Sequence, residues 1–182
     1  MTEIAIVIGG GSGVWLELNE ARELIGEREA LLIGCNHAAR DVADPLDAFV
    51  TMHPDLLPMW LKSRAEQGHP PPAKIYHASH RARAPVESTP VESWGGSSGL
   101  LCVKVALDLG CTKIILCGVP MHQNACHYDR LNRRWSEAAQ YHRSWEKRLP
   151  EMQGKVKSCS GWTARLLGSP DRNWINGDEG TT

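Results

Sequence analysis

The residue types best suited to acid–base chemistry gather in one short segment, residues 122–129, which holds two histidines, a thiol and a carboxylate. His127 stands two residues before Asp129, and a histidine with a free pKa near ~6.5 accepts a proton from a hydroxyl group at neutral pH. His53, two residues before Asp55, offers the same combination. The sequence therefore predicts a general base at His127 or, as the second candidate, at His53, each with a carboxylate beside it.

The spacing within this segment matches no zinc pattern, and its two histidines are not four residues apart as they would be on one helix face. We therefore assign no metal ligand from the sequence. Mg²⁺ is left open as a cofactor that no motif indicates.

Anion binding is predicted by the first fourteen residues, where a short apolar run, residues 4–8, leads into a glycine-rich turn and then a helical pattern. Such a turn exposes backbone N–H groups at the positive end of a helix, where phosphates bind. Glycine also lets a ligand approach the backbone closely. The predicted phosphate-binding residues are Gly9, Gly10, Gly11, Ser12 and Gly13.

This turn departs from the dinucleotide fingerprint, which has glycine at its first, third and sixth positions and an acidic residue after the second strand. Counted from Gly9, the sixth position is Val14, and the second predicted strand is followed by Cys35 and Asn36. The sequence also lacks the Gly-Lys-Ser/Thr of a phosphate loop. The pattern favours a nucleotide site of another kind, with an NAD site kept as an alternative.

A second glycine–serine turn, at residues 95–99, opens another helical pattern. In a parallel sheet the carboxyl ends of the strands meet at one edge, so both turns would lie there and bind parts of one nucleotide. Asn36 would offer an amide to a base or a ribose hydroxyl, or act as an ordinary helix N-cap. The additional predicted ligand contacts are Asn36, Ser97, Ser98, Gly99 and Gly118. For each turn alone, a tight structural connection is the alternative.

Strand-like and helix-like segments alternate along the chain. The predicted strands are 4–8, 30–33, 48–51, 74–77, 113–117 and 155–158, and the predicted helices are 14–25, 36–42, 56–65, 100–109, 131–149 and 162–167. Such alternation is typical of a doubly wound, mostly parallel sheet with helices on both faces. The sequence thus predicts a Rossmann-like α/β fold.

One domain is predicted over residues 1–177, because a chain of 182 residues is long enough for one well-buried core. Residues 78–93 are polar and rich in His, Arg, Ser and Pro, and they are too many for an ordinary connection. We predict a mobile loop or lid there, and a frayed tail at residues 178–182.

The composition argues against several kinds of partner. The formal net charge of −1 gives no overall attraction to nucleic acid or anionic lipid. No stretch approaches the ~20 apolar residues that span a bilayer. The six cysteines form no Cys-x-x-Cys pair, as expected for reduced thiols, and no charged-then-apolar leader precedes the first strand. A cytoplasmic protein is expected, and a homo-oligomer is left open.

Several motifs together resemble one known family. They are the first glycine turn, Cys35-Asn36, LDAFVTMHPD at residues 46–55 and GSSGLLCVKVALDLGCTKIILCGVPM at residues 96–121. The pattern resembles the Rossmann-like proteins related to archaeal 6-hydroxymethylpterin diphosphokinase, the MptE-like or DUF115 group. It is also similar to bacterial sialyltransferases of the same architecture. The resemblance covers about residues 3–129 and implies that the first glycine turn binds a nucleotide.

The chain departs from this family pattern in three places. Gly11-Ser12-Gly13 replaces Gly-Pro-Ser, His53-Pro54-Asp55 replaces an Asp-Pro pair, and Gly118-Val119-Pro120 lacks the Asp that usually follows. These departures argue against metal-dependent diphosphoryl transfer more strongly than they argue against nucleotide binding.

The expected function is transfer of a glycosyl or diphosphoryl group from a nucleotide-sugar or nucleoside phosphate to a hydroxyl acceptor, which His127 or His53 would deprotonate. Two alternatives stay open. One is a non-catalytic nucleotide-binding sensor or assembly factor, which the missing Asp after Gly118 favours. The other is an NAD-linked oxidoreductase.

Overall fold

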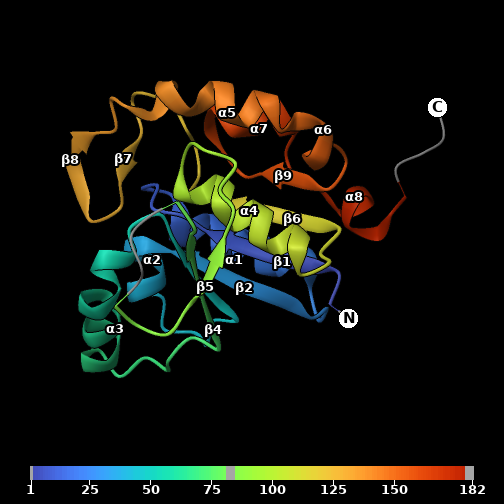
Figure 1. The fold of residues 1–182 in the computed structure, drawn as a ribbon. Helices are drawn as coiled ribbons and strands as arrows, with labels where there is room; N and C mark the ends of the chain where they lie inside the picture. Colours follow the sequence, from blue (N-terminus) through green and yellow to red (C-terminus); the bar gives the residue numbers. More distant parts are fainter. Residues whose placement is uncertain (1, 81–84, 179–182) are drawn as a thin grey trace.

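The computed structural model describes residues 2–80 and 85–178. A seven-stranded sheet crosses the molecule in the order β5-β4-β3-β2-β1-β6-β9, and all of its neighbouring strands are parallel (Figure 1). Its strands are β1 (Ile4–Ile8), β2 (Ala30–Cys35), β3 (Ala48–Thr51), β4 (Lys74–Ala78), β5 (Thr89–Val91), β6 (Lys113–Cys117) and β9 (Val156–Ser158). The predicted parallel α/β sheet is confirmed.

Helices cover both faces of this sheet, so the molecule has three layers (Figure 1). One face carries α1 (Val14–Ile25), α2 (Asn36–Asp41), α3 (Leu57–Glu66) and α8 (Arg172–Asn176). The other face carries α4 (Ser98–Asp108), α5 (His142–Lys147), α6 (Leu149–Met152) and α7 (Gly161–Leu167). The doubly wound, Rossmann-like arrangement is therefore confirmed as well.

The central strand β1 contributes to both hydrophobic cores. Successive side chains of a strand point to opposite faces of the sheet. Ala5 and Val7 accordingly pack in the core on the α4 side, whereas Ile6 and Ile8 pack in the core on the α1 side. A strand buried on both faces has a continuous apolar sequence, as residues 4–8 do.

The direction in which strands are added to the sheet reverses once. The chain places β2, β3, β4 and β5 on one side of β1, and α4 then leads back to β6, which pairs with the other side of β1. Ligands of doubly wound proteins bind in the crevice beyond the carboxyl ends of the strands at such a reversal. Here that crevice lies where β1 and β6 end.

The predicted helix over residues 131–149 is wrong in its first part. The chain instead forms an antiparallel hairpin of β7 (Cys126–His127) and β8 (Arg130–Arg134). The short 3-10 helix η2 (Ala138–Tyr141) follows, and then α5. Ala138 and Trp145, the buried members of the apolar stripe that suggested a helix, both come after the hairpin. The basic run before them has no apolar seam to hold a helix against the core.

Residues 78–93, predicted as a loop or lid, include the edge strand β5, which pairs in parallel with β4. Residues 81–84 of that segment, and residues 179–182 of the predicted tail, lie outside the described residues. The sequence pattern also missed α8, whose five residues bury Trp174 and Ile175. A helix of little more than one turn shows too little periodicity to be recognised.

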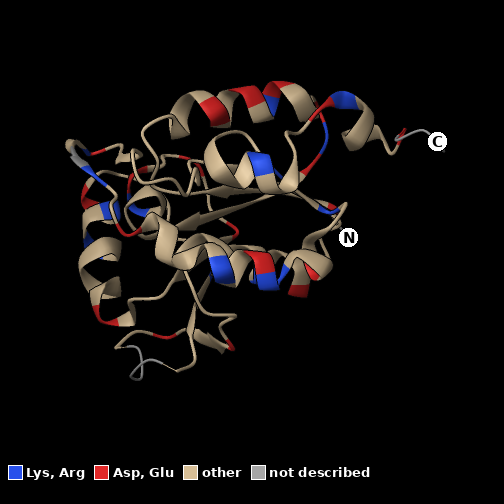
Figure 2. Cartoon of the chain, turned by 90° about the horizontal axis from the view of Figure 1, so that it is seen from above, with Lys and Arg blue, Asp and Glu red and all other residues tan. Residues whose placement is uncertain are grey.

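The outer surface mixes charges of both signs. The helices carry Lys and Arg as well as Asp and Glu (Figure 2), in keeping with the formal net charge of −1. None of the helices in residues 2–80 and 85–178 combines the length and apolar character needed to cross a membrane. The six cysteines are all free, and four of them are buried.

Candidate functional site

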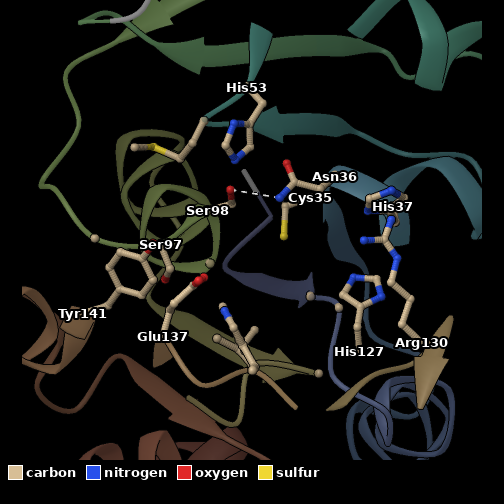
Figure 3. Close-up of a pocket in the computed structure, with 18 of the residues that line it drawn as sticks. Cys35, Asn36, His37, His53, Ser97, Ser98, His127, Arg130, Glu137 and Tyr141 are labelled. Carbon is tan, nitrogen blue, oxygen red and sulfur yellow. Dashed lines mark hydrogen bonds between the residues drawn. The ribbon is translucent and has the colours of Figure 1, made fainter. Parts of the chain in front are cut away.

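A pocket of about 500 Å³ opens where β1, β2, β3 and β6 end, at the reversal in strand order (Figure 3). It is lined by Gly9, Gly10, Cys35, Asn36, His37, Met52, His53, Leu56, Trp60, Gly96, Ser97, Ser98, Gly99, Gly118, Val119, His127, Arg130, Arg134, Trp135, Ser136, Glu137 and Tyr141. The two glycine-containing turns thus share one edge of the sheet, as the sequence predicted.

The pocket collects many of the predicted site residues, but it does not collect all of them. Those that line it are Gly9, Gly10, Asn36, His53, Ser97, Ser98, Gly99, Gly118 and His127. Those that do not are Gly11, Ser12, Gly13, Asp55 and Asp129. The first glycine turn therefore presents only its leading two residues to the cavity.

The amide groups of the first glycine turn are largely used within the chain. The N–H groups of Gly9, Gly11 and Ser12 donate to the carbonyls of Cys117, Gly118 and Cys126, at 2.7, 2.8 and 2.9 Å. A Cβ placed on Gly9 would lie 2.4 Å from the Gly118 carbonyl oxygen. Glycine is thus required here because the ends of β1 and β6 approach each other closely.

The His127 imidazole lies over this same turn. A Cβ placed on Gly10 would lie 2.3 Å from Nε2 of His127. In a dinucleotide site the pyrophosphate approaches the backbone at the second glycine of the fingerprint, which corresponds to Gly11 here. A Cβ placed on Gly11 would lie 2.7 Å from Cδ of Pro120. Here the side chain of the predicted general base occupies the space beside Gly10.

The N-terminus of α4 faces the pocket more openly. Ser97 is its N-cap, and its hydroxyl accepts a hydrogen bond from the Leu100 N–H. The next two residues, Ser98 and Gly99, both line the cavity at the start of this eleven-residue helix. The first amides of a helix and the positive end of its dipole attract anions.

Asn36 joins three elements at the floor of the pocket (Figure 3). Its Nδ2 donates to the Ser98 hydroxyl at 3.0 Å, and its Oδ1 accepts from the Thr51 hydroxyl at 2.9 Å. Its φ of 51° is left-handed, a conformation that asparagine tolerates better than most residues. Asn36 therefore positions the start of α4 against β2 and β3, and keeps half of its hydrogen-bonding capacity for a ligand.

The predicted pair of His127 and Asp129 is present. Nδ1 of His127 lies 2.5 Å from the Asp129 carboxylate, which leaves Nε2 on the side of Gly10 and the pocket. Arg40 and Arg130 approach the same carboxylate at 3.8 and 3.7 Å. The carboxylate thus fixes an imidazole that lines the pocket, with its other nitrogen beside Gly10.

A second imidazole stands against this pair. The rings of His37 and His127 meet edge to face with centroids 5.3 Å apart. Burial lowers the pKa of His37, and the positive charge of Arg40 lowers it further. His37 is therefore neutral at pH 7 and adds no charge beside the candidate base.

His53, the second candidate base, lines the pocket at the end of β3, on the other side from His127 (Figure 3). Asp55 lies in the 3-10 helix η1 (Pro54–Leu56) and is exposed. In the described part of the chain no hydrogen bond or ion pair joins the two side chains. His53 thus lacks the orienting carboxylate that His127 has.

Sequence reasoning missed the residues that the hairpin and its continuation bring to the pocket. Arg130 and Arg134 come from β8, and Glu137 and Tyr141 stand beside Ser97 (Figure 3). The hairpin turns at Tyr128-Asp129, which lacks the Asn-Gly or Asp-Gly signal of two-residue hairpins. No local signal marked these residues.

The hairpin is attached to the body of the protein through Tyr128. Its hydroxyl donates to the Asp41 carboxylate at the end of α2, and its ring meets Trp15 of α1 edge to face at 5.1 Å. Arg40 binds the same carboxylate. Although burial opposes ionisation, the hydrogen bonds from Arg40 and Tyr128 lower the pKa of Asp41 to about 2.

This pKa predicts acid sensitivity with a definite sign. Asp41 is held ionised more strongly in the folded chain than at its usual pKa of 3.8, so its contribution is complete above about pH 4 and is lost as the pH falls toward 2. We expect Asp41→Asn to cost about 2 kcal/mol at pH 7 and less than half of that at pH 2.5. Urea unfolding at the two pH values measures this difference.

Asp108→Asn is the matched control, because that carboxylate is 52% exposed in an i,i+4 pair with Lys104. Exposed pairs of this kind contribute about 0.5 kcal/mol or less. Equal losses for the two variants at pH 7 would contradict a special role for Asp41.

No family model, curated protein or solved structure matches this chain with significant similarity.

Proposed function

We propose that the pocket binds a nucleoside phosphate or nucleotide-sugar and that the protein transfers a glycosyl or phosphoryl group from it to a hydroxyl acceptor. The observation that carries the proposal is the meeting of two features in one cavity. The α4 N-terminus opens on the pocket at Ser97–Gly99, and His127 with its Asp129 partner stands over Gly10.

The phosphate is placed at the start of α4 rather than on the first glycine turn. Three amides of that turn already donate within the chain, whereas Ser98 and Gly99 begin a helix and face the cavity. Donors fixed in advance stabilise the charge that develops on a leaving phosphate. Gly9 and Gly10 would form the neighbouring wall.

His127 is the proposed general base. Its Nε2 would take the proton of the acceptor hydroxyl as the hydroxyl oxygen bonds to the transferred group and the nucleotide leaves. The Asp129 carboxylate on Nδ1 would orient the ring and stabilise the imidazolium, as a carboxylate does in a Ser-His-Asp triad. His53 is retained as the second candidate from the opposite wall.

The resemblance to MptE-like proteins and bacterial sialyltransferases supports this class of reaction. The donor set for a metal ion is not assembled: among the described residues no three His, Cys, Asp or Glu side chains come together as a metal site requires. The proposed mechanism therefore assigns no role to Mg²⁺.

The two alternative functions, an NAD-linked oxidoreductase and a nucleotide sensor, do not fit the site equally well. An NAD-linked oxidoreductase is disfavoured because the Gly11 backbone, where a pyrophosphate would approach, lies against Pro120 and Gly118. It is also disfavoured because Asn36 follows β2 and is bonded to Ser98 and Thr51. A nucleotide sensor would use the same phosphate position without the base. Turnover therefore separates the sensor from the transferase, and nucleotide binding alone does not.

The binding half of the proposal is tested by thermal shift with nucleoside phosphates and nucleotide-sugars. A ligand at a hundred times its Kd stabilises the folded state by about 2.7 kcal/mol, which for a chain of this size raises Tm by about 5 to 10 °C. Ser98→Asp should keep the fold, since a carboxylate suits a helix N-terminus, and should lose most of this shift by repelling phosphate.

Ser169→Asp is the control for added charge, because Ser169 is exposed after α7 and does not line the pocket. It should retain the full shift. If no nucleoside phosphate or nucleotide-sugar stabilises the wild-type protein, the proposed function is rejected.

A further inference from the structure

The hairpin brings two arginines to the pocket, and Figure 3 shows Arg130 on the side away from Ser97 and Ser98. Arg130 and Arg134 both line the cavity, and both are exposed. Arg130 pairs with His127 across the hairpin, and Arg134 pairs with Cys126. The register of the hairpin shifts between these two pairs. Opposed residues of two strands project to the same side, so Arg130, opposite His127, stands on the same side of the hairpin as the candidate base.

These guanidinium groups have few acidic partners among the described residues. In the described part of the chain Arg130 pairs with Asp129 alone, at 3.7 Å, and Asp129 is already bonded to His127. Within the described residues no ion pair involves Arg134. Of the described Asp and Glu residues, Glu137 alone lines the cavity, and Figure 3 shows it near Tyr141 and Ser97, away from Arg130.

The pocket thus has two separate sources of positive potential. One is the α4 N-terminus with its backbone amides, and the other is the pair of arginines on β8. Guanidinium groups bind phosphate and carboxylate with two parallel hydrogen bonds. A ligand with one phosphate at α4 leaves the arginines without an anion.

We propose that Arg130 and Arg134 form a second oxyanion subsite, which binds a phosphate or carboxylate other than the one at the start of α4. This inference rests on the proposed function, and it concerns the substrate class. The second oxyanion is either the outer phosphate of a nucleoside diphosphate or nucleotide-sugar, or an acidic group on the hydroxyl acceptor.

The test is titration calorimetry at low salt, about 50 mM, where screening is weak. The probes are the common nucleoside monophosphates, the matching diphosphates, inorganic phosphate added to the monophosphate complex, and pyrophosphate alone. The variants are Arg130→Gln and Arg134→Gln. Arg143→Gln is the matched control, because Arg143 is exposed on α5 and does not line the pocket.

If the subsite takes the outer phosphate of the donor, the diphosphate binds more tightly than the monophosphate. Each pocket variant then weakens the diphosphate by about tenfold, as loss of a charged hydrogen bond does, and changes the monophosphate little. If the subsite binds an acidic group of the acceptor, both pocket variants bind the monophosphate and the diphosphate as the wild-type protein does. Inorganic phosphate then binds to the monophosphate complex of the wild-type protein but not to that of either variant.

Two results would overturn the proposal. One is that neither pocket variant differs from Arg143→Gln with any probe. The other is that both variants weaken the monophosphate as much as the diphosphate, since the arginines would then hold the first phosphate. If no nucleotide binds but pyrophosphate binding depends on the two arginines, the subsite stands and the nucleotide function falls.

Discussion

His127→Ala is expected to lower turnover by about a hundredfold to ten-thousandfold, the range that a general base contributes, and to change nucleotide affinity little. The reason is that His127 lines the pocket beside Gly10, whereas the proposed phosphate position is at the start of α4. Turnover is measured as release of nucleotide from whichever donor stabilises the protein. Affinity is measured with the same donor by calorimetry.

Asp129→Asn and His53→Ala are the informative comparisons. Asp129→Asn keeps the His127 ring but removes its charged partner, so turnover should fall by a smaller factor and its pH profile should change. His53→Ala should retain most of the activity, because no carboxylate orients that ring. A larger loss for His53→Ala than for His127→Ala would reverse the assignment of the base. A wild-type protein that binds nucleotide and shows no turnover would favour the sensor.

Arg64→Met is expected to be the most destabilising single change away from the pocket, at about 4 kcal/mol in urea unfolding. Arg64 is 1% exposed, and its guanidinium donates to four backbone carbonyls, those of Ala39, Val42, Asp44 and Pro70, at 2.6 to 2.7 Å. Methionine replaces the side chain's volume but leaves these partly buried acceptors unpaired. The contacts hold α3 against the segment between α2 and β3.

Arg64→Lys should recover little of this stability, because a single ammonium group cannot reach carbonyls that a planar guanidinium meets with three nitrogens. Arg165→Met, at an exposed position on α7, is the control for loss of an arginine. If Arg64→Met lowered the free energy of unfolding by less than 1 kcal/mol, the four hydrogen bonds would stabilise the fold no more than hydrogen bonds from water to the same carbonyls.

Local patterns in the sequence were enough to determine the architecture. The continuous apolar run at residues 4–8, the helical period of residues 14–25 and the turns between them each report on neighbouring residues. Backbone sterics and right-handed crossovers leave few ways to assemble such units. The parallel sheet followed, and so did the shared edge on which Gly9 and Ser97–Gly99 lie.

The contents of the pocket were decided by contacts between residues far apart in the chain. A glycine turn has the same sequence whether its amides face a phosphate or the Gly118 carbonyl, and only the position of β6 beside β1 selects the second. The hairpin at residues 126–134 is held in place by contacts with the first glycine turn, α1 and α2. The amino-acid pattern within the hairpin therefore does not predict it. The sequence by itself therefore determined the sheet, the edge at which the pocket lies and the His127–Asp129 pair. Tertiary structure alone decided that the imidazole covers Gly10 and that Arg130 and Arg134 reach the cavity, because those placements depend on distances between elements that no local pattern encodes.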